Sequence, residues 1–513
     1  MFQHLRGGGG VTNGDADTNV IRRLGCHEAY QLAMHTLDQY RGTVVACRYS
    51  LPTSLARPGA LETLKARFYN ALARVVLAQP HLQVGIIGEN SADPAFVRLD
   101  RLDLRNHVDW RLVDDSSDLE PLYLGSMQSQ LDSRYHDLAT LPGWRVIIFH
   151  DVEAESADVL YVWNHPHHDG MSGKIFHEQL LRSLNREAEE SVLNIQQGSD
   201  SWILDLPDPS DILPPPPEIL CHWPLTPPFL VKALWKELKP LSILPAGVTY
   251  ATWAPIQASP YMTRFRTFVV DNDTVTKVVG ACRQRNTTLT GLLHAFVLVS
   301  LTLALGDMKG FASRTPFDLR HFLPSNTPKY PRIQPKEFMC NYVSVLDHEF
   351  DAELVAAIRS KFSSKATGAS LSADVMDIVW SVSARVRQEI KARLDSGVKN
   401  DMISIMKFVR DWRTQQESET QKPRYLSWLV TNLGVLDGGA PDTREQEQEG
   451  WSIRRAELVL SAEVPSAALS VSVMTVRDEQ MCVTCSWQDC VVDANLGEKL
   501  MADLERWLKE VVS

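Results

Sequence analysis

The sequence predicts an α/β (α+β) protein with two lobes, each a mixed sheet flanked by helices. The chain has 513 residues, more than one hydrophobic core usually supports, so two domains are expected. Apolar residues make up 44% and charged residues 22%, which is typical of a globular protein with a substantial core. Segments with strand and helix patterns lie on both sides of a proline-rich stretch at 206–230, which we interpret as the crossover between the lobes.

The N-terminal lobe is predicted to span residues 21–205. Its clearest helix is expected at 60–78, where apolar residues recur on one helical face. Apolar runs predict strands at 43–49, 84–87, 145–149 and 159–163. Residues 1–20 contain four consecutive glycines and no apolar core of a signal peptide, so they are predicted to form a disordered tail.

The C-terminal lobe is predicted to span residues 231–513. We expect a strand at 267–270, helices at 274–285 and 288–305, a long helical region at 374–413, strands at 456–460, 468–475 and 481–487 that finish its sheet, and a closing helix at 495–512. The apolar run at 289–305 is too short and too often interrupted by polar residues for a membrane span, so it is predicted to be a buried helix. The crossover is expected to be extended, without helix or central strand, because proline removes backbone donors.

Charge and cysteine content limit the partners and the compartment. A net charge of -11 argues against nucleic acid or an anionic membrane as the main partner, and we expect no integral membrane contact. The eight cysteines are scattered through apolar segments, which predicts reduced thiols and a cytoplasmic protein. Cys482 and Cys485 have the spacing of a redox or zinc pair, but an alternating strand would place them on opposite faces.

The candidate site lies where the strand at 159–163 runs into His165. Asp169 and Gly170 then close a turn, and a helix pattern follows at once. Imidazole titrates near neutral pH, so a histidine on a rigid scaffold can take a proton from an alcohol or an amine. One base is sufficient for that chemistry, so His167, His168 and His177 are expected to be ordinary polar residues.

A zinc site is an alternative interpretation of the same cluster. His165, His167 and Asp169 match H-x-H-x-D, in which imidazoles hold the metal. Gly170 stands where that motif requires a further histidine, so we predict that no metal is bound.

His165, Asp169 and Gly170 also fit H-x-x-x-D-G, which resembles the active-site motif of the chloramphenicol-acetyltransferase-like superfamily. That group includes BAHD acyltransferases, condensation domains of nonribosomal peptide synthetases, and fungal alcohol and trichothecene O-acetyltransferases. Asn164 replaces the first histidine of the longer motif. Other segments that resemble these proteins are the opening at 23–35 with the strand at 43–49, the loop at 315–320, and the tunnel-lining segments at 341–344 and 431–435.

The resemblance implies a fold and several roles. It implies two lobes with an active-site tunnel between them, and His165 as the general base. Asp169 would point away from the reacting centre and pair with Arg320, whereas Gly170 would keep the tunnel open. The residues alone leave open that Asp169 orients His165 directly, or that Gly170 serves only backbone geometry. Asn432 is a candidate donor to the oxyanion or, equally, a turn-shaping residue.

The expected function is transfer of a short acyl group, most simply acetyl, from an acyl-CoA to a hydroxyl of a small metabolite. Acetyl-CoA or another acyl-CoA would be a co-substrate, with no permanently bound cofactor, and no residues are assigned to its binding. One alternative is a condensation-type enzyme that takes its acyl group from a carrier protein in trans. The other is a non-catalytic binding protein on the same fold.

Overall fold

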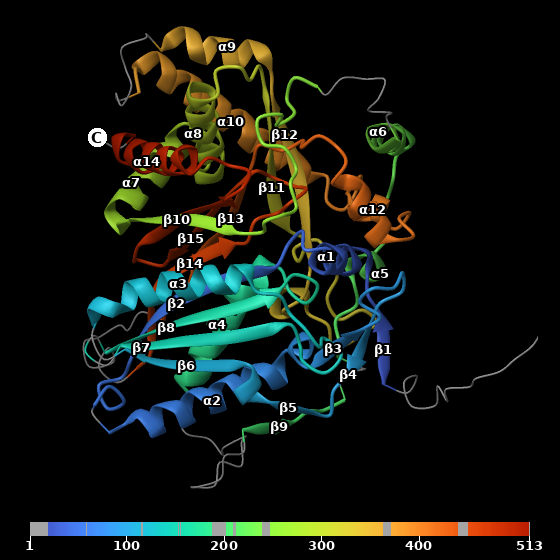
Figure 1. The fold of residues 1–513 in the computed structure, drawn as a ribbon, viewed down its shortest axis with the longest axis vertical. Coiled ribbons are helices and arrows are strands. Elements are labelled where there is room, and N and C mark those ends of the chain that lie inside the picture. The colour runs from blue at the N-terminus through green and yellow to red at the C-terminus, as the bar shows by residue number, and fades with distance from the viewer. Residues whose placement is uncertain are drawn as a thin grey trace, which may run out of the picture.

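The computed structural model describes residues 19–57, 59–113, 116–151, 153, 155–186, 202–208, 212–238, 247–362, 371–439 and 450–511. The two halves of the molecule are each built on a sheet, as predicted (Figure 1). Residues 1–18 of the predicted tail lie outside the described ranges, and Val20, within that predicted tail, already belongs to a strand.

The lower half in Figure 1 contains a five-stranded sheet. Its strand order is β14 (Ser452–Leu460), β2 (Gly42–Ser50), β8 (Ser156–Asn164), β7 (Trp144–Asp151) and β6 (Val108–Val113). Helices α2 (Leu61–Ala78) and α4 (Gly170–Leu184) cover one face, and α3 (Leu119–Asp132) covers the other. Side chains along a strand alternate between faces, and both faces of this sheet are covered, so β8 is apolar from Val159 to Trp163. Tyr161 and Trp163 pack towards α4, and Leu160 and Val162 pack towards α3.

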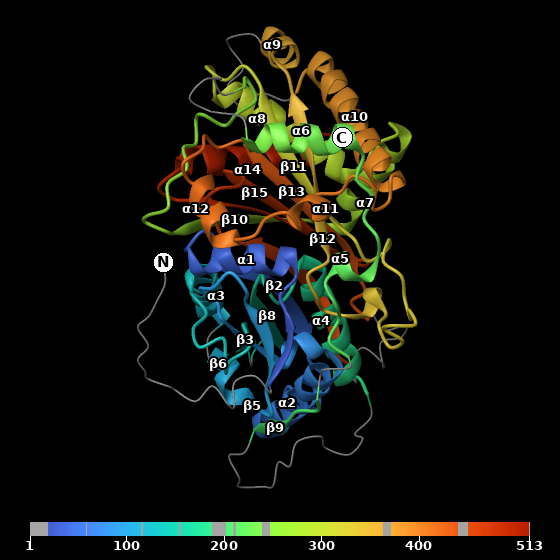
Figure 2. The same ribbon diagram turned by 90° about the vertical axis from the view of Figure 1, so that its right-hand side faces the viewer.

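Smaller elements flank this half. One sheet has the order β1 (Val20–Arg23), β4 (Ala95–Arg98), β3 (Val84–Ile87), and another pairs β5 (Arg101–Asp103) with β9 (Ile203–Asp205). Helix α1 (Cys26–Thr36) lies between the two halves (Figure 2). An ion pair of 2.7 Å between Arg22 and the buried Glu28 ties β1 to the start of α1.

The upper half contains a six-stranded sheet. Its order is β10 (Thr263–Val270), β16 (Met481–Gln488), β15 (Leu469–Val476), β13 (Trp428–Leu436), β11 (Phe311–Asp318) and β12 (Val343–Phe350). The helices on this sheet are α7 (Asn272–Gln284), α8 (Leu289–Ala304), α9 (Ala352–Lys361), α10 (Ala373–Asp395) and α14 (Ala494–Glu510). Helix α8 is almost wholly buried, which confirms the prediction for the apolar run at 289–305.

The predicted location of the strand at 456–460 was wrong. This strand, β14, pairs antiparallel with β2 and so completes the lower sheet, although it follows β13 in the chain. It also lies beside β15 and β16, so the two sheets meet along it. A strand pattern shows that a segment is buried but does not name its partner, and this exchange therefore had no sequence signal.

Two helix predictions also need correction. The long helix expected at 374–413 ends at Asp395, because Gly397 and Asn400 adopt positive φ; the short helices α11 (Ile403–Met406) and α12 (Trp412–Glu419) follow. The proline-rich crossover is not wholly extended, since it contains α5 (Pro217–Leu220) and the start of α6 (Pro227–Leu238). Both begin with proline, which is tolerated in the first turn because that amide has no helical partner.

Within the described part of the chain, no single helix is long and apolar enough to cross a membrane, and α7 and α8 pass that test only as a pair bent by 92°.

Candidate active site

His165 lies in a turn between two rigid elements. Strand β8 ends at Asn164, and α4 begins at Gly170. The turn opens onto a cavity of about 310 Å³ between the two halves, and His165, Asp169 and Gly170 all contribute to its wall. Other parts of the wall come from α1, β2, β11, β12, β13, β14 and the segment 402–412.

The geometry of His165 leaves one ring nitrogen for chemistry. Nδ1 of His165 faces Nδ2 of Asn341, 3.3 Å away. In the tautomer with the proton on Nδ1, Nε2 keeps a lone pair that can accept a proton. Burial lowers the pKa of His165 below its ordinary value, although the charge of Asp169 opposes that change. The imidazole is therefore neutral at pH 7 and competent as a base.

Asn341 anchors this arrangement from the other half of the molecule. Its Nδ2 donates a hydrogen bond of 2.7 Å to the main-chain carbonyl of His165. Its Oδ1 accepts one of 2.9 Å from Nδ1 of His27 on α1. Asn341 Nδ2 also lies 3.3 Å from His165 Nδ1, so the same amide group contacts both the main chain and the ring of His165.

Sequence analysis gave no role to His27 or Asn341. Both lay in segments that resembled the superfamily, and that was their only signal. His27 is buried and faces the cavity, and burial, followed by the neighbouring His165, lowers its pKa to about 4. His27, Asn341 and His165 thus form a neutral chain that joins α1, the segment before β12 and the turn after β8.

Asp169 forms a buried ion pair with Arg320. The guanidinium donates hydrogen bonds of 2.7 and 3.0 Å to the two carboxylate oxygens, and both side chains are nearly inaccessible to solvent. Asp169 also accepts bonds from the backbone amides of Ser172 and Tyr342, at 2.9 and 2.8 Å. Although burial raises the pKa of Asp169, these donors, led by Arg320, hold it below its ordinary value.

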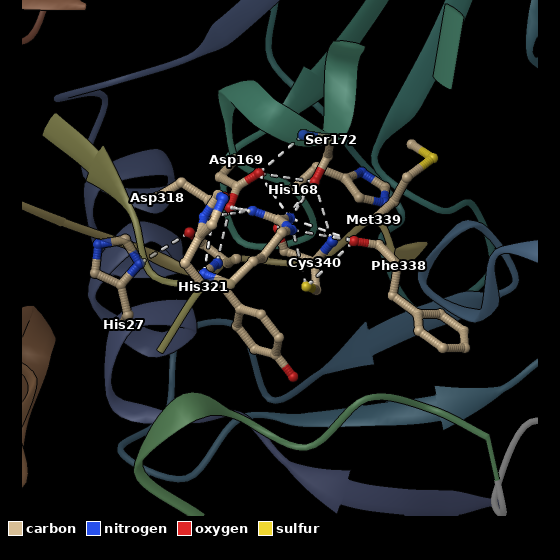
Figure 3. A network of polar contacts seen from close by, with 12 residues as sticks. His27, His168, Asp169, Ser172, Asp318, His321, Phe338, Met339 and Cys340 are labelled. Carbon is tan, nitrogen blue, oxygen red and sulfur yellow. Dashed lines mark hydrogen bonds and ion pairs between the residues drawn. The ribbon is translucent and has the colours of Figure 1, made fainter. Parts of the chain in front are cut away.

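The remaining donors of Arg320 are also satisfied. Asp318 and the carbonyl groups of Phe338 and Cys340, which are labelled in Figure 3, accept bonds of 2.9 to 3.4 Å from the guanidinium. Because every oxygen of Asp169 is occupied by these partners, the carboxylate holds the turn after β8 in shape and does not bond the imidazole of His165. The first four residues of the segment 315–320 belong to a strand and not to the expected loop, since β11 continues to Asp318.

Gly170 is required for space. Its φ is not positive, so backbone geometry alone does not demand glycine there. A Cβ at this position would lie 3.1 Å from Cδ2 of Leu433, another residue of the cavity wall. A side chain would therefore push into the cavity beside His165.

The two asparagines of the predicted site have structural partners. Asn432 donates to Thr290 on α8 at 3.2 Å and accepts from the amide of Gly434 at 2.8 Å, which fits the turn-shaping alternative because Gly434 has a φ of +71°. Asn164 accepts a bond of 2.7 Å from Nδ1 of His167. It does not contact His165 through its side chain in the described hydrogen bonds, so it braces the turn from behind.

The other histidines face the interior. His168 contacts the hydroxyl of Tyr161 at 3.0 Å, and His177 contacts that of Tyr49 at 2.9 Å. The side chains of the alternative zinc motif diverge, since His167 points to Asn164 and Asp169 to Arg320. Among the residues with described positions, no group of three His, Cys, Asp or Glu side chains is placed to hold a metal ion.

Comparisons with curated proteins agree with this geometry. The chain is 28% identical over 502 residues to a probable alcohol acetyltransferase, FCK4, of Fusarium pseudograminearum, covering 96% of this chain and 95% of that protein. It is 26% identical over 501 residues to a probable alcohol acetyltransferase, crmB, of Aspergillus fumigatus, covering 95% and 99%.

Solved structures share the fold. The trichothecene 15-O-acetyltransferase TRI3 of Fusarium sporotrichioides superposes with a TM-score of 0.68 at 14% identity, covering 96% of this chain and 94% of that one. The condensation domain of the monacolin K polyketide synthase MokA superposes with a TM-score of 0.55 at 12% identity, covering 96% of each. The fold is therefore the two-lobed chloramphenicol-acetyltransferase-like fold that the motif indicated.

The family follows from the sequence match. The family model described as alcohol acetyltransferase matches residues 123–506, about three quarters of the chain, and this range contains the turn after β8 as well as Arg320 and Asn341. The protein is an acyltransferase and belongs to the alcohol acetyltransferase family.

Proposed function

We propose that the protein transfers an acetyl group from acetyl-CoA to a hydroxyl of a small metabolite, with His165 as the general base. The observation that carries this proposal is the placement of His165: the residue lines the cavity, on a turn that Asn341 holds by a hydrogen bond of 2.7 Å to the main-chain carbonyl of His165. A hydroxyl is a poor nucleophile at pH 7, so a base within hydrogen-bond reach must accept its proton during attack.

The reaction balances with one base. Nε2 accepts the proton of the alcohol as its oxygen attacks the thioester carbonyl. The carbon–sulfur bond then breaks, and the imidazolium returns the proton to the leaving thiolate. The products are an ester and free CoA, and His165 is again neutral.

The surrounding residues position the base. Asp169 and Arg320 fix the turn, and Asn341 holds the main-chain carbonyl of His165. Gly170 leaves room for the substrates next to His165. Asn432 shapes the cavity wall at Gly434 in this proposal and does not stabilise the oxyanion, because its Nδ2 donates to Thr290 and its Oδ1 accepts from Gly434.

A carrier protein is the second candidate donor. The similarity to the condensation domain of MokA favours it, because carrier-bound acyl groups are the substrates for which condensation domains are built. Both donors end in the same thioester, so the base would act identically on either.

The test is release of free thiol from acetyl-CoA by the purified protein, with and without a panel of hydroxylated metabolites. Alcohol-dependent release, together with formation of the acetyl ester by mass spectrometry, supports the proposal. Transfer only from acetyl-phosphopantetheine on a carrier protein would show that the carrier protein, and not acetyl-CoA, is the donor. Binding of alcohols with no transfer from either donor would favour the non-catalytic alternative.

A further inference from the structure

The cavity wall includes three carboxyl groups, of which Asp169 and Asp318 accept hydrogen bonds from Arg320 and the third, that of Glu463, does not. Glu463 follows β14 and lines the cavity, half-buried, together with Tyr30 and Tyr40. The rest of the wall around the cavity is largely apolar, with Met171, Val345, Leu429 and Leu460 among its residues. A carboxyl group on such a wall needs hydrogen-bond donors, because its desolvation is unfavourable.

The loop that carries Glu463 is held rigidly by both halves of the molecule. The amide of Val464 donates to the carbonyl of Gln39 at 2.8 Å, and the amide of Ser461 donates to that of Gly42 at 3.1 Å. From the upper half, the hydroxyl of Tyr261 donates to the carbonyl of Ala462 at 2.6 Å. The main chain at Glu463 is therefore fixed before any ligand binds, as a recognition group requires.

The nearby cations are committed elsewhere. Arg314 forms a bidentate pair with Asp347, at 2.7 and 3.2 Å. Arg424 lies behind the loop and donates to the carbonyl groups of Ala254 and Ser466, both at 2.7 Å. Neither is within ion-pair distance of Glu463 in the described part of the chain.

The balance at Glu463 leaves its carboxyl group short of donors. Burial raises the pKa of Glu463 above its ordinary value; a hydrogen bond from Ser466 and the charges of Arg314 and Arg424 only partly offset that. A hydrogen-bond donor on a bound ligand would supply the partner that the carboxyl group of Glu463 needs.

Glu463 is one side chain away from the base. The ring of Tyr40 lies 5.7 Å, between centroids, from the ring of His165. Tyr40 also faces Glu463 closely enough for the carboxylate to raise the pKa of its hydroxyl, after burial. The hydroxyl of Tyr40 is turned to Thr43, at 2.7 Å, so it does not occupy Glu463.

We propose that Glu463 is a specificity-determining residue that binds a second hydrogen-bond donor, a hydroxyl or an ammonium group, on the acceptor whose reacting hydroxyl lies at His165. This rests on the proposed function. The acceptor class is an apolar skeleton with two polar ends, because the cavity wall is largely apolar and the ring of Tyr40 lies beside that of His165. Carboxylates accept strong hydrogen bonds from both donors and repel anions, so an acceptor with an acidic group at that end is excluded.

The experiment compares three probes of equal length: a primary alcohol, the α,ω-diol and the ω-amino alcohol, in series from four to eight carbons. Binding is measured by calorimetry without donor, and kcat/KM by thiol release from acetyl-CoA. The variants are Glu463→Leu, the isosteric Glu463→Gln, and Glu417→Gln as the matched control, an exposed carboxyl on α12 that does not line the cavity. Melting temperatures show whether each variant folds. If Glu463→Leu does not fold, the affinities of Glu463→Gln for the amino alcohols test the inference instead.

We expect the affinity of the best diol or amino alcohol, relative to the plain alcohol, to fall about tenfold or more in Glu463→Leu and to remain unchanged in Glu417→Gln. In Glu463→Gln, loss for the amino alcohol alone identifies an ammonium group, and equal loss for the diol identifies a hydroxyl. If the relative affinities match the wild type in Glu463→Leu at every length, the inference is overturned. Absence of thiol release with any alcohol would count against the proposed function, while the binding comparison would still decide the role of Glu463.

Discussion

Arg320 and Asp169 are 151 positions apart in the sequence, yet two hydrogen bonds of 2.7 and 3.0 Å join the guanidinium to the carboxylate across the two halves of the molecule. The pair fixes the turn that presents His165 to the cavity, without either side chain bonding the imidazole. Fold stability and activity are therefore linked at this site, because loss of the pair would free the turn.

Asp169→Ala and Arg320→Ala should each lower the free energy of unfolding by about 3 to 5 kcal/mol, since removal of one partner leaves a buried charge without its counterion. The double variant should lose much less than the sum of the single losses. Urea unfolding monitored by circular dichroism measures the free energy of unfolding of the wild type, the two single variants and the double variant. Additive losses would show that the two groups do not interact.

His165→Ala should reduce acetyl transfer by about 100-fold or more while leaving the fold intact, which is the usual scale for a lost general base. His167→Ala and His168→Ala should do much less per folded molecule, because their rings face the interior and contact Asn164 and Tyr161. Thiol release, corrected for the folded fraction, compares the three. A loss in His167→Ala or His168→Ala equal to that in His165→Ala would contradict the assignment of His165 as the base.

Asn341→Asp should change the pH profile of the enzyme. Because burial lowers the pKa of His165, the acidic fall of kcat/KM in the wild type should lie below pH 6.5. A carboxylate at position 341 would stabilise the imidazolium, raise the pKa of His165 and move that fall to higher pH. Asn341→Ala removes the donor without adding charge, so it should lower kcat with little change in KM. An unshifted profile in Asn341→Asp would separate Asn341 from the base.

Stability should decrease as the pH falls from about 6.5 to 4. Burial lowers the pKa of His35 and His177 to about 4 and that of His167 to about 3. In this window the unfolded chain binds protons that the folded protein does not. Each such histidine therefore lowers the free energy of unfolding by about 1.4 kcal/mol for each pH unit of acidification. Urea unfolding at a series of pH values measures the slope, and His177→Asn should reduce it. A flat profile over this window would contradict the buried neutral histidines.

Gly170→Ala should separate stability from activity. Alanine is favoured over glycine in a helix, so α4 should be as stable as before or slightly more stable. Its Cβ would nevertheless approach Leu433 to 3.1 Å and narrow the cavity, so kcat/KM should fall by about tenfold, most for bulky alcohols. Leu433→Val in the same chain shortens the opposing side chain and should restore part of the loss. Loss of stability without loss of activity would indicate a backbone role for glycine.

Much of this protein was determined by local sequence. The apolar runs of β8 and α8 and the helical face of α2 predicted elements that the structure places within a few residues of the expected bounds. The H-x-x-x-D-G spacing located His165, Asp169 and Gly170 on one turn, because a strand end and a helix start six residues apart can only enclose a tight turn. These features depend on neighbours in the chain, so local patterns carry them.

What joins distant segments was decided by the tertiary structure. The pairing of β14 with β2, the break after Asp395 and the chain from His27 through Asn341 to His165 rest on contacts between residues far apart in the sequence. An asparagine before a strand, or a glutamate after one, has the same local pattern whether it faces solvent or a cavity. Asn341 and Glu463 acquire their places only when the two sheets pack together, because the surface between them belongs to neither half alone.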